Sequence, residues 1–220
     1  MFVKGIVLSF GLPRKPRLHL PGIKSFFKRY GILLAFGMLL LTGLALGAVC
    51  ACIADGKTLD SLDFLFTTNL DARLSQSAVG TFCACFASDF IFLLCVYLLG
   101  LAAWGIPFLF LLICFKGFGT GLTAGYLCIS HSLSGAGFYL LVLLPGTFLF
   151  CAALIRFAAR AFFCSKRIFR WFFYKTIPAY TLRQELINYS SRFVSTLILT
   201  FLASLLDTLL WTLFAGTFQF

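Results

Sequence analysis

Three charged residues lie inside otherwise apolar stretches, and these are the residues that could do chemistry: Lys116, Asp89 and Asp207. An ionisable side chain in such a stretch normally faces the protein interior and pairs with another charge. At a rise of about 1.5 Å per helical residue, the three share a similar depth, so we expect Lys116 to pair with Asp89 or Asp207. The pair would fix the order of the helices; the alternatives are an ion or proton pathway and an unpaired lysine that extends toward the membrane surface.

Composition indicates the environment in which these charges are held. Of 220 residues, 61% are hydrophobic and only 11% are charged, which places the chain in a membrane. Because a crossing needs about 20 apolar residues, we predict an all-α membrane protein, a compact bundle of five transmembrane helices. The predicted spans are 30–54, 78–101, 105–127, 134–157 and 193–214.

The distribution of basic residues predicts the topology. Lys and Arg favour cytoplasmic segments near span ends, and they concentrate in an N-terminal arm, 1–29, and in the segment 158–192. The segment 55–77 is acidic and is predicted to be the outer loop. The five spans then place the N-terminus in the cytoplasm and the C-terminus outside.

The basic segment 158–192 also contains many aromatic residues. Basic and aromatic residues together can bind nucleic acid, but directly after a span they favour an interfacial helix on anionic lipid headgroups. We therefore predict a lipid bilayer partner and no nucleic acid. The residues assigned to headgroup contact are Arg160, Lys166, Arg167, Arg170 and Lys175.

Glycine spacing predicts where helices approach closely. Gly117, Gly121 and Gly125 recur every four residues on the third span, and Gly43 and Gly47 do so on the first. Such small-residue faces let helix backbones come together. They leave self-association open as an alternative to packing within one chain. Two prolines are predicted to kink spans, Pro107 and Pro145.

The cysteines offer a second possible site of chemistry. Cys50 and Cys52 end the first span, and Cys83 and Cys85 begin the second, so four sulfurs lie at similar depth. Residues two apart on a helix point to different faces, which favours simple packing over a metal site or disulfide. The sequence contains no metalloprotease, P-loop, nucleophile-elbow or dinucleotide motif. We expect no catalytic residue, no metal and no cofactor.

The combined pattern resembles the stage II sporulation protein M family. The resemblance covers about residues 82–220 and is carried by DFIFLLCVYLLG from Asp89, GIPFLFLLICFKGFGTGLTAGYL from Gly105, and LASLLD at residues 202–207. It implies a five-span protein of the bacterial cytoplasmic membrane that works in engulfment during endospore formation. It also implies a non-enzymatic scaffold for two peptidoglycan-degrading partners, stage II sporulation proteins D and P.

Two functional hypotheses follow. For a scaffold, the outer loop is the expected docking surface, because its leucines recur at near-helical spacing between Leu59 and Leu74. A simple connector with an interfacial helix is the alternative for this loop. For a transporter or permease subunit, the cluster of Lys116, Asp89 and Asp207 should line a water-filled cavity.

Overall fold

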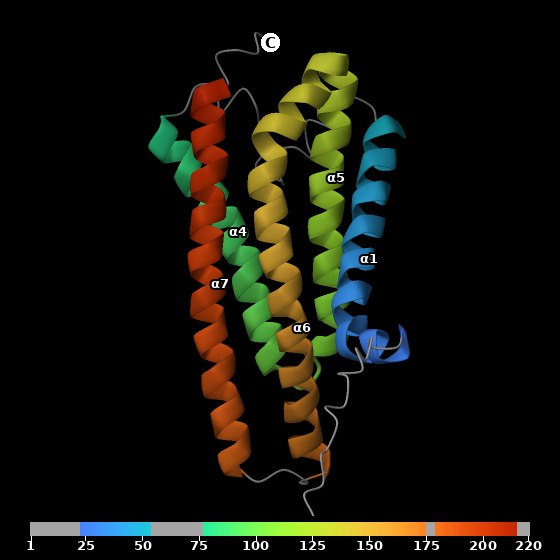
Figure 1. Ribbon diagram of the computed structural model, residues 1–220, viewed down its shortest axis with the longest axis vertical. Coiled ribbons are helices and arrows are strands. Elements are labelled where there is room, and N and C mark those ends of the chain that lie inside the picture. Colours follow the sequence, from blue (N-terminus) through green and yellow to red (C-terminus); the bar gives the residue numbers. More distant parts are fainter. Residues whose placement is uncertain (1–22, 54–76, 175–178, 215–220) are drawn as a thin grey trace, which may run out of the picture. The chain divides into compact units, whose positions relative to one another are not determined.

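The structure, a computed structural model, describes residues 23–53, 77–174 and 179–214 (Figure 1). The chain divides into two units, Met1–Gly31 and Ile32–Phe220, and the packing discussed below belongs to the second. The described residues form helices and no strands. These helices are α1 (Ile23–Ile53), α4 (Ala78–Leu101), α5 (Gly105–Phe138), the π-helix η1 (Tyr139–Leu143), α6 (Leu144–Tyr174) and α7 (Ala179–Phe214).

Five stretches within the described helices are long and apolar enough to cross a membrane, which confirms the predicted class of all-helical, multi-pass membrane protein. Many of their large apolar side chains face outward, as on Leu111 (69% exposed) and Phe148 (70% exposed). Lipid, unlike water, solvates such surfaces without cost. The stretches are Tyr30–Ile53, Ala78–Leu101, Gly105–Ile129, Ser134–Phe173 and Leu182–Phe214.

A three-residue turn joins α4 to α5. The Ala102 amide donates to the carbonyl oxygens of Leu98 and Leu99, which closes the end of α4. The buried Ser165 hydroxyl donates to the Ala102 carbonyl oxygen at 2.7 Å, so α6 holds the turn in place. Pro107 lies in the first turn of α5, where a missing amide hydrogen costs no helical hydrogen bond. The predicted kink at Pro107 is therefore wrong, because this proline only begins a helix.

The chain reverses direction between Thr120 and Tyr139 although helix is assigned throughout. The Tyr139 hydroxyl donates to the Thr120 carbonyl oxygen at 3.5 Å, whereas a straight helix would separate these residues by about 28 Å. The π-helix η1 follows, with the Leu144 amide donating to the Tyr139 carbonyl oxygen. Pro145 comes next and cannot donate to Leu141, the residue four positions earlier. The irregularity expected at Pro145 is thus a π-helical turn immediately before it.

Where the structure describes the segment 158–192, at residues 158–174 and 179–192, the chain is helical rather than a loop. α6 runs unbroken to Tyr174, and α7 begins at Ala179. Ala158, Ala161 and Ser165 recur at helical spacing and are fully buried, so this part of α6 packs like the rest of the helix. A helix of 31 residues is about 47 Å long and exceeds the roughly 30 Å apolar core of a bilayer. The basic residues of the described parts, 158–174 and 179–192, therefore lie on helical extensions of the spans.

Tyr189 is the centre of the packing between α4, α6 and α7. Its ring stacks between Phe157 and Tyr97, with centroid distances of 5.2 and 5.4 Å. Its hydroxyl lies 3.2 Å from both the Val96 and the Tyr97 carbonyl oxygens, to which it donates. Gly100 makes this possible, because a Cβ there would lie 2.7 Å from the Tyr189 ring.

Replacing Tyr189 by phenylalanine should lower the free energy of unfolding by about 1 kcal/mol, because it leaves the stacked ring and removes one hydroxyl donor. Thermal unfolding of the purified protein in detergent would measure the loss. Tyr189→Leu is the comparison, since it removes the ring contacts as well and should cost more. Equal stability of wild type and Tyr189→Phe would show that the hydrogen bonds contribute nothing net.

Candidate functional site

Lys116 forms an ion pair with Asp89. Its Nζ lies 2.9 Å from Asp89 Oδ1, and the two side chains are 13% and 18% exposed. The Phe92 and Phe150 rings lie 4.7 and 4.8 Å from the same nitrogen, as ring centroids. Because aromatic faces attract cations, the ammonium group on α5 is held by α4 through Asp89 and Phe92, and by α6 through Phe150. Of the two acids predicted as alternatives, Asp89 is the one in contact with Lys116.

Asp207 is held separately on α7. It is 9% exposed, and the Cys85 thiol of α4 donates to its Oδ2 at 3.2 Å. Gly146 of α6 lies directly against it, since a Cβ at Gly146 would be 2.9 Å from the Asp207 Cβ. The second acid is therefore in contact with α4 through Cys85 and with α6 through Gly146.

All three charged residues line one cavity of about 140 Å³. The lining comes from α4, α5, η1, α6 and α7, so most of the described spans contribute to it. Much of the remaining lining is polar. The hydroxyl-bearing residues in it are Ser88, Thr120, Thr123, Tyr139, Thr147 and Ser204.

A row of hydroxyl side chains follows the buried face of α7. Thr196, Thr200, Ser204 and Thr208 are each at most 9% exposed, and each hydroxyl donates to the carbonyl oxygen four residues earlier, at 2.8 to 3.1 Å. Each hydroxyl proton is thus satisfied within the helix. The small side chains let α7 pack closely while keeping its interior face polar near Asp207.

The predicted glycine faces meet each other across α1 and α5. A Cβ at any of four glycines would lie under 3.0 Å from a carbonyl oxygen of the other helix. Gly43 and Gly47 contact the α5 backbone at Cys114 and Phe118. Gly117 and Gly121 contact the α1 backbone at Leu40 and Leu44, and a Cβ at Gly125 would lie 2.6 Å from that of Ala51. Figure 1 shows the two helices side by side.

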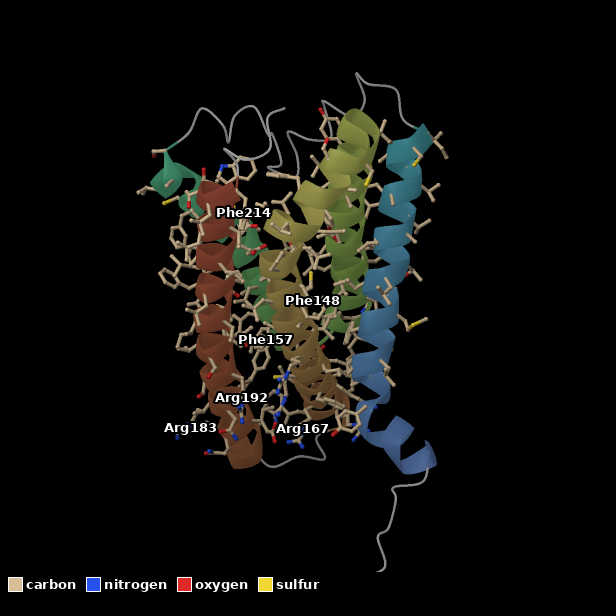
Figure 2. The ribbon with its side chains drawn as sticks, turned by 45° about the horizontal axis from the view of Figure 1, so that its top comes forward. Phe148, Phe157, Arg167, Arg183, Arg192 and Phe214 are labelled. Atoms are coloured by element: carbon tan, nitrogen blue, oxygen red, sulfur yellow. The ribbon has the colours of Figure 1, made fainter. Side chains whose placement is uncertain are left out.

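The residues assigned to headgroup contact are exposed. Arg160, Lys166, Arg167 and Arg170 lie on the outer face of α6, and Arg167 forms an ion pair with Glu185 of α7. Figure 2 shows Arg167, Arg183 and Arg192 near one end of α6 and α7, with Phe214 at the opposite end of α7. Lys175 and residues 55–76 of the predicted outer loop lie outside the described residues.

The four cysteines near the span ends do not act as one group. Cys85 is buried against Asp207, whereas Cys52 and Cys83 are exposed and Cys50 is intermediate. Within the described part of the chain, no three His, Cys, Asp or Glu side chains are placed to hold a metal ion. The cysteine that contributes to the candidate site, Cys85, does so as a hydrogen-bond donor.

Several cavity residues were not anticipated from the sequence. Gly146 follows Pro145 directly, and a glycine beside a proline in a span could have indicated close approach of another helix. The hydroxyl residues of α7 recur every four residues, a spacing that predicts one buried polar face on the helix. No sequence pattern predicts that Tyr139 lines the cavity, because its position depends on the chain reversal that precedes it.

Comparison with protein-family models, with curated proteins and with solved structures gives no match.

Proposed function

We propose that this protein is a non-enzymatic scaffold of the bacterial cytoplasmic membrane, similar to stage II sporulation protein M. It would form a compact five-helix bundle with its N-terminus in the cytoplasm and its C-terminus outside. Its partners would be peptidoglycan-degrading enzymes, such as stage II sporulation proteins D and P, acting during engulfment. The outer loop 55–77 would be their docking surface.

The observation that carries this proposal is the direct backbone contact between α1 and α5. At Gly43, Gly47, Gly117 and Gly121 there is no side chain between the helices that could rearrange. Close-packed interfaces of this kind have discrete arrangements and do not deform continuously. The ion pair of Lys116 with Asp89 adds a further fixed connection, between α5 and α4. Helices that are fixed to one another in this way suit a protein that holds partner proteins in position.

Affinity purification from native membranes in mild detergent, followed by mass spectrometry, would test the scaffold. We expect cell-wall hydrolases to be recovered with the full chain and lost when residues 55–77 are replaced by a polar linker of equal length. A matched control replaces Arg167 and Glu185 by neutral residues at the far end of the helices and should keep the partners. Recovery of an ATPase or permease subunit without any hydrolase would contradict the proposal.

One observation favours a second candidate function, solute transport. Lys116, Asp89 and Asp207 line a single polar cavity, as a transport site in the middle of a membrane would require. For a transporter, Lys116→Met should abolish solute or ion flux into proteoliposomes while the protein still assembles. For a scaffold, the same variant should first lose stability, and partner recovery should follow the amount of folded protein.

A further inference from the structure

Arginine side chains follow the seam where α6 packs against α7. Arg156, Arg160 and Arg167 are exposed, and their spacing of four and eleven residues places them on one face of α6. Glu185 and Arg192, seven residues apart, likewise share one face of α7. The ion pair of Arg167 with Glu185 joins the two faces, and Figure 2 shows Arg167 and Arg192 near the same end of the two helices. The charged faces of α6 and α7 therefore border one seam.

Three of these arginines lie at nearly the same level of the helices. The rings of Phe157 and Phe193 pack across the seam, with centroids 6.0 Å apart. Arg156 and Arg192 directly precede these two phenylalanines in the chain, so their backbones are close in level. Arg160 follows Arg156 by four residues, or about 6 Å along the helix. The three guanidinium groups therefore start from one short stretch of the seam.

The positive charge of this stretch is not balanced by the protein. Glu185 is the only acidic residue between residues 151 and 200, and Arg167 is its partner. Within the part of the chain that the structure describes, Arg156, Arg160 and Arg192 have no carboxylate partner. Neighbouring like charges repel and oppose the packing of α6 on α7. An anion between the two helices would relieve this repulsion.

The depth of these arginines indicates that the anion belongs to the membrane. Lys116, near the middle of the span Gly105–Ile129, lies against the Phe150 ring. Arg156 follows Phe150 by six residues, or about 9 Å, which is less than the roughly 15 Å from the centre of a bilayer to the edge of its apolar core. Arg160 lies near that edge. Long arginine side chains at this depth extend toward the headgroups, where lipid phosphates are the nearest anions.

The chemistry of the site favours a headgroup with more than one phosphate. A guanidinium group binds phosphate through two parallel hydrogen bonds. Three guanidinium groups carry more positive charge than one singly charged phosphate neutralises, and two linked phosphates match them better. Phe163, which is 52% exposed, lies between Arg160 and Arg167 on the same face of α6 and offers an apolar contact to an acyl chain. Basic sites between membrane helices are known to bind lipid headgroups of this kind.

We propose that the seam between α6 and α7 binds one molecule of cardiolipin, a phospholipid with two phosphates. Arg156 and Arg160 of α6 and Arg192 of α7 hold the phosphates, and the pair of Arg167 with Glu185 lies at the end of the site farther from the bilayer centre. This is one discrete site, whereas the sequence predicted only general headgroup contact and did not include Arg156 or Arg192. The site is independent of the scaffold proposal, because it requires no protein partner.

The test is thermal unfolding of the purified full chain in detergent, titrated with cardiolipin. We expect a saturable rise in unfolding temperature of about 3 to 6 °C at ten times the dissociation constant. Phosphatidylglycerol carries one phosphate, so it should need about tenfold more lipid phosphate for the same rise, because its phosphates are not linked. Phosphatidylcholine, which has no net charge, and inorganic diphosphate, which has no acyl chains, should give no comparable rise.

Arg192→Gln should raise the cardiolipin concentration for half-maximal stabilisation about tenfold or more, because it removes one charged donor group. Arg183→Gln is the matched control. Arg183 is also exposed on α7, but it is nine residues from Arg192, which places it on the opposite face of the helix. It should therefore leave the cardiolipin dependence unchanged. Arg156→Gln makes the same test from α6 should Arg192→Gln not fold.

Three results would overturn the proposal. The first is an equal rise with cardiolipin and phosphatidylcholine, and the second is an equal rise with phosphatidylglycerol at the same phosphate concentration, which would indicate only a general anionic surface. The third is an equal loss in Arg183→Gln and Arg192→Gln. None of these results would bear on whether the protein recovers cell-wall hydrolases, so the two proposals fail separately.

Discussion

Replacing Gly121 by leucine is expected to abolish most of the folded protein. A Cβ at this position would lie under 3.0 Å from the Leu44 carbonyl oxygen, and the Leu44 Cα would be only 2.8 Å away. Backbone atoms of α1 cannot rotate out of the way as a side chain could, so the helices would have to separate. We expect a loss of about 3 kcal/mol or more in the free energy of unfolding. The measurement is the monodisperse fraction and unfolding temperature in detergent.

Gly37→Leu is the matched control for this change. Gly37 lies in α1, the helix that Gly121 of α5 contacts, but a Cβ at Gly37 meets nothing within 4 Å. Leucine is favoured over glycine in a helix by up to about 1 kcal/mol, so this variant should be as stable as wild type or slightly more stable. Similar behaviour of Gly121→Leu and Gly37→Leu would show that the contact between α1 and α5 is not needed for folding.

Lys116→Met is expected to destabilise the protein by about 3 to 5 kcal/mol, because it leaves the Asp89 carboxylate without its ammonium partner. Replacing both members of the pair, as Lys116→Met with Asp89→Asn, should recover most of this loss, since two neutral side chains of similar volume remain. A double-mutant cycle of unfolding free energies in detergent measures the coupling between the two residues.

The exposed pair of Arg167 and Glu185 supplies the control for the cycle. These side chains are 46% and 39% exposed, so the same cycle there should give a coupling of at most about 1 kcal/mol. A coupling between Lys116 and Asp89 as small as this would mean that the pair does not fix the helices. A double variant no more stable than Lys116→Met alone would lead to the same conclusion.

The apolar spans could be predicted because their physical signal is local. The second predicted span, 78–101, has the bounds of α4, and the third begins where α5 begins, at Gly105. The prediction stopped too early on α6, because a search for apolar windows ends at the first group of charges. The helix continues since Ala158, Ala161 and Ser165 keep a buried face beneath the arginines. The helical spacing of the buried residues, and not the mean hydropathy of a window, indicates that the helix continues.

Of the candidate site, only the charged residues Lys116, Asp89 and Asp207 could be predicted from the sequence. Their shared depth follows from counting residues along helices, which made a pair between Lys116 and an acid predictable. The choice of Asp89 depends on which helices are neighbours, and this order cannot be obtained from one chain. Cys85 was considered as a sulfur ligand or packing residue, yet it donates to Asp207 because α4 and α7 meet there. Such roles arise from tertiary contacts between distant segments.

The glycine contact between α1 and α5 also affects how their association responds to temperature. Most helix interfaces immobilise rotatable side chains, and this loss of rotamer freedom opposes association more strongly as temperature rises. Gly43, Gly47, Gly117 and Gly121 have no rotamers to lose. Their contact with carbonyl oxygens of the other helix instead brings dispersion and weak Cα–H···O attraction. At these four positions the contact between α1 and α5 therefore costs no side-chain entropy.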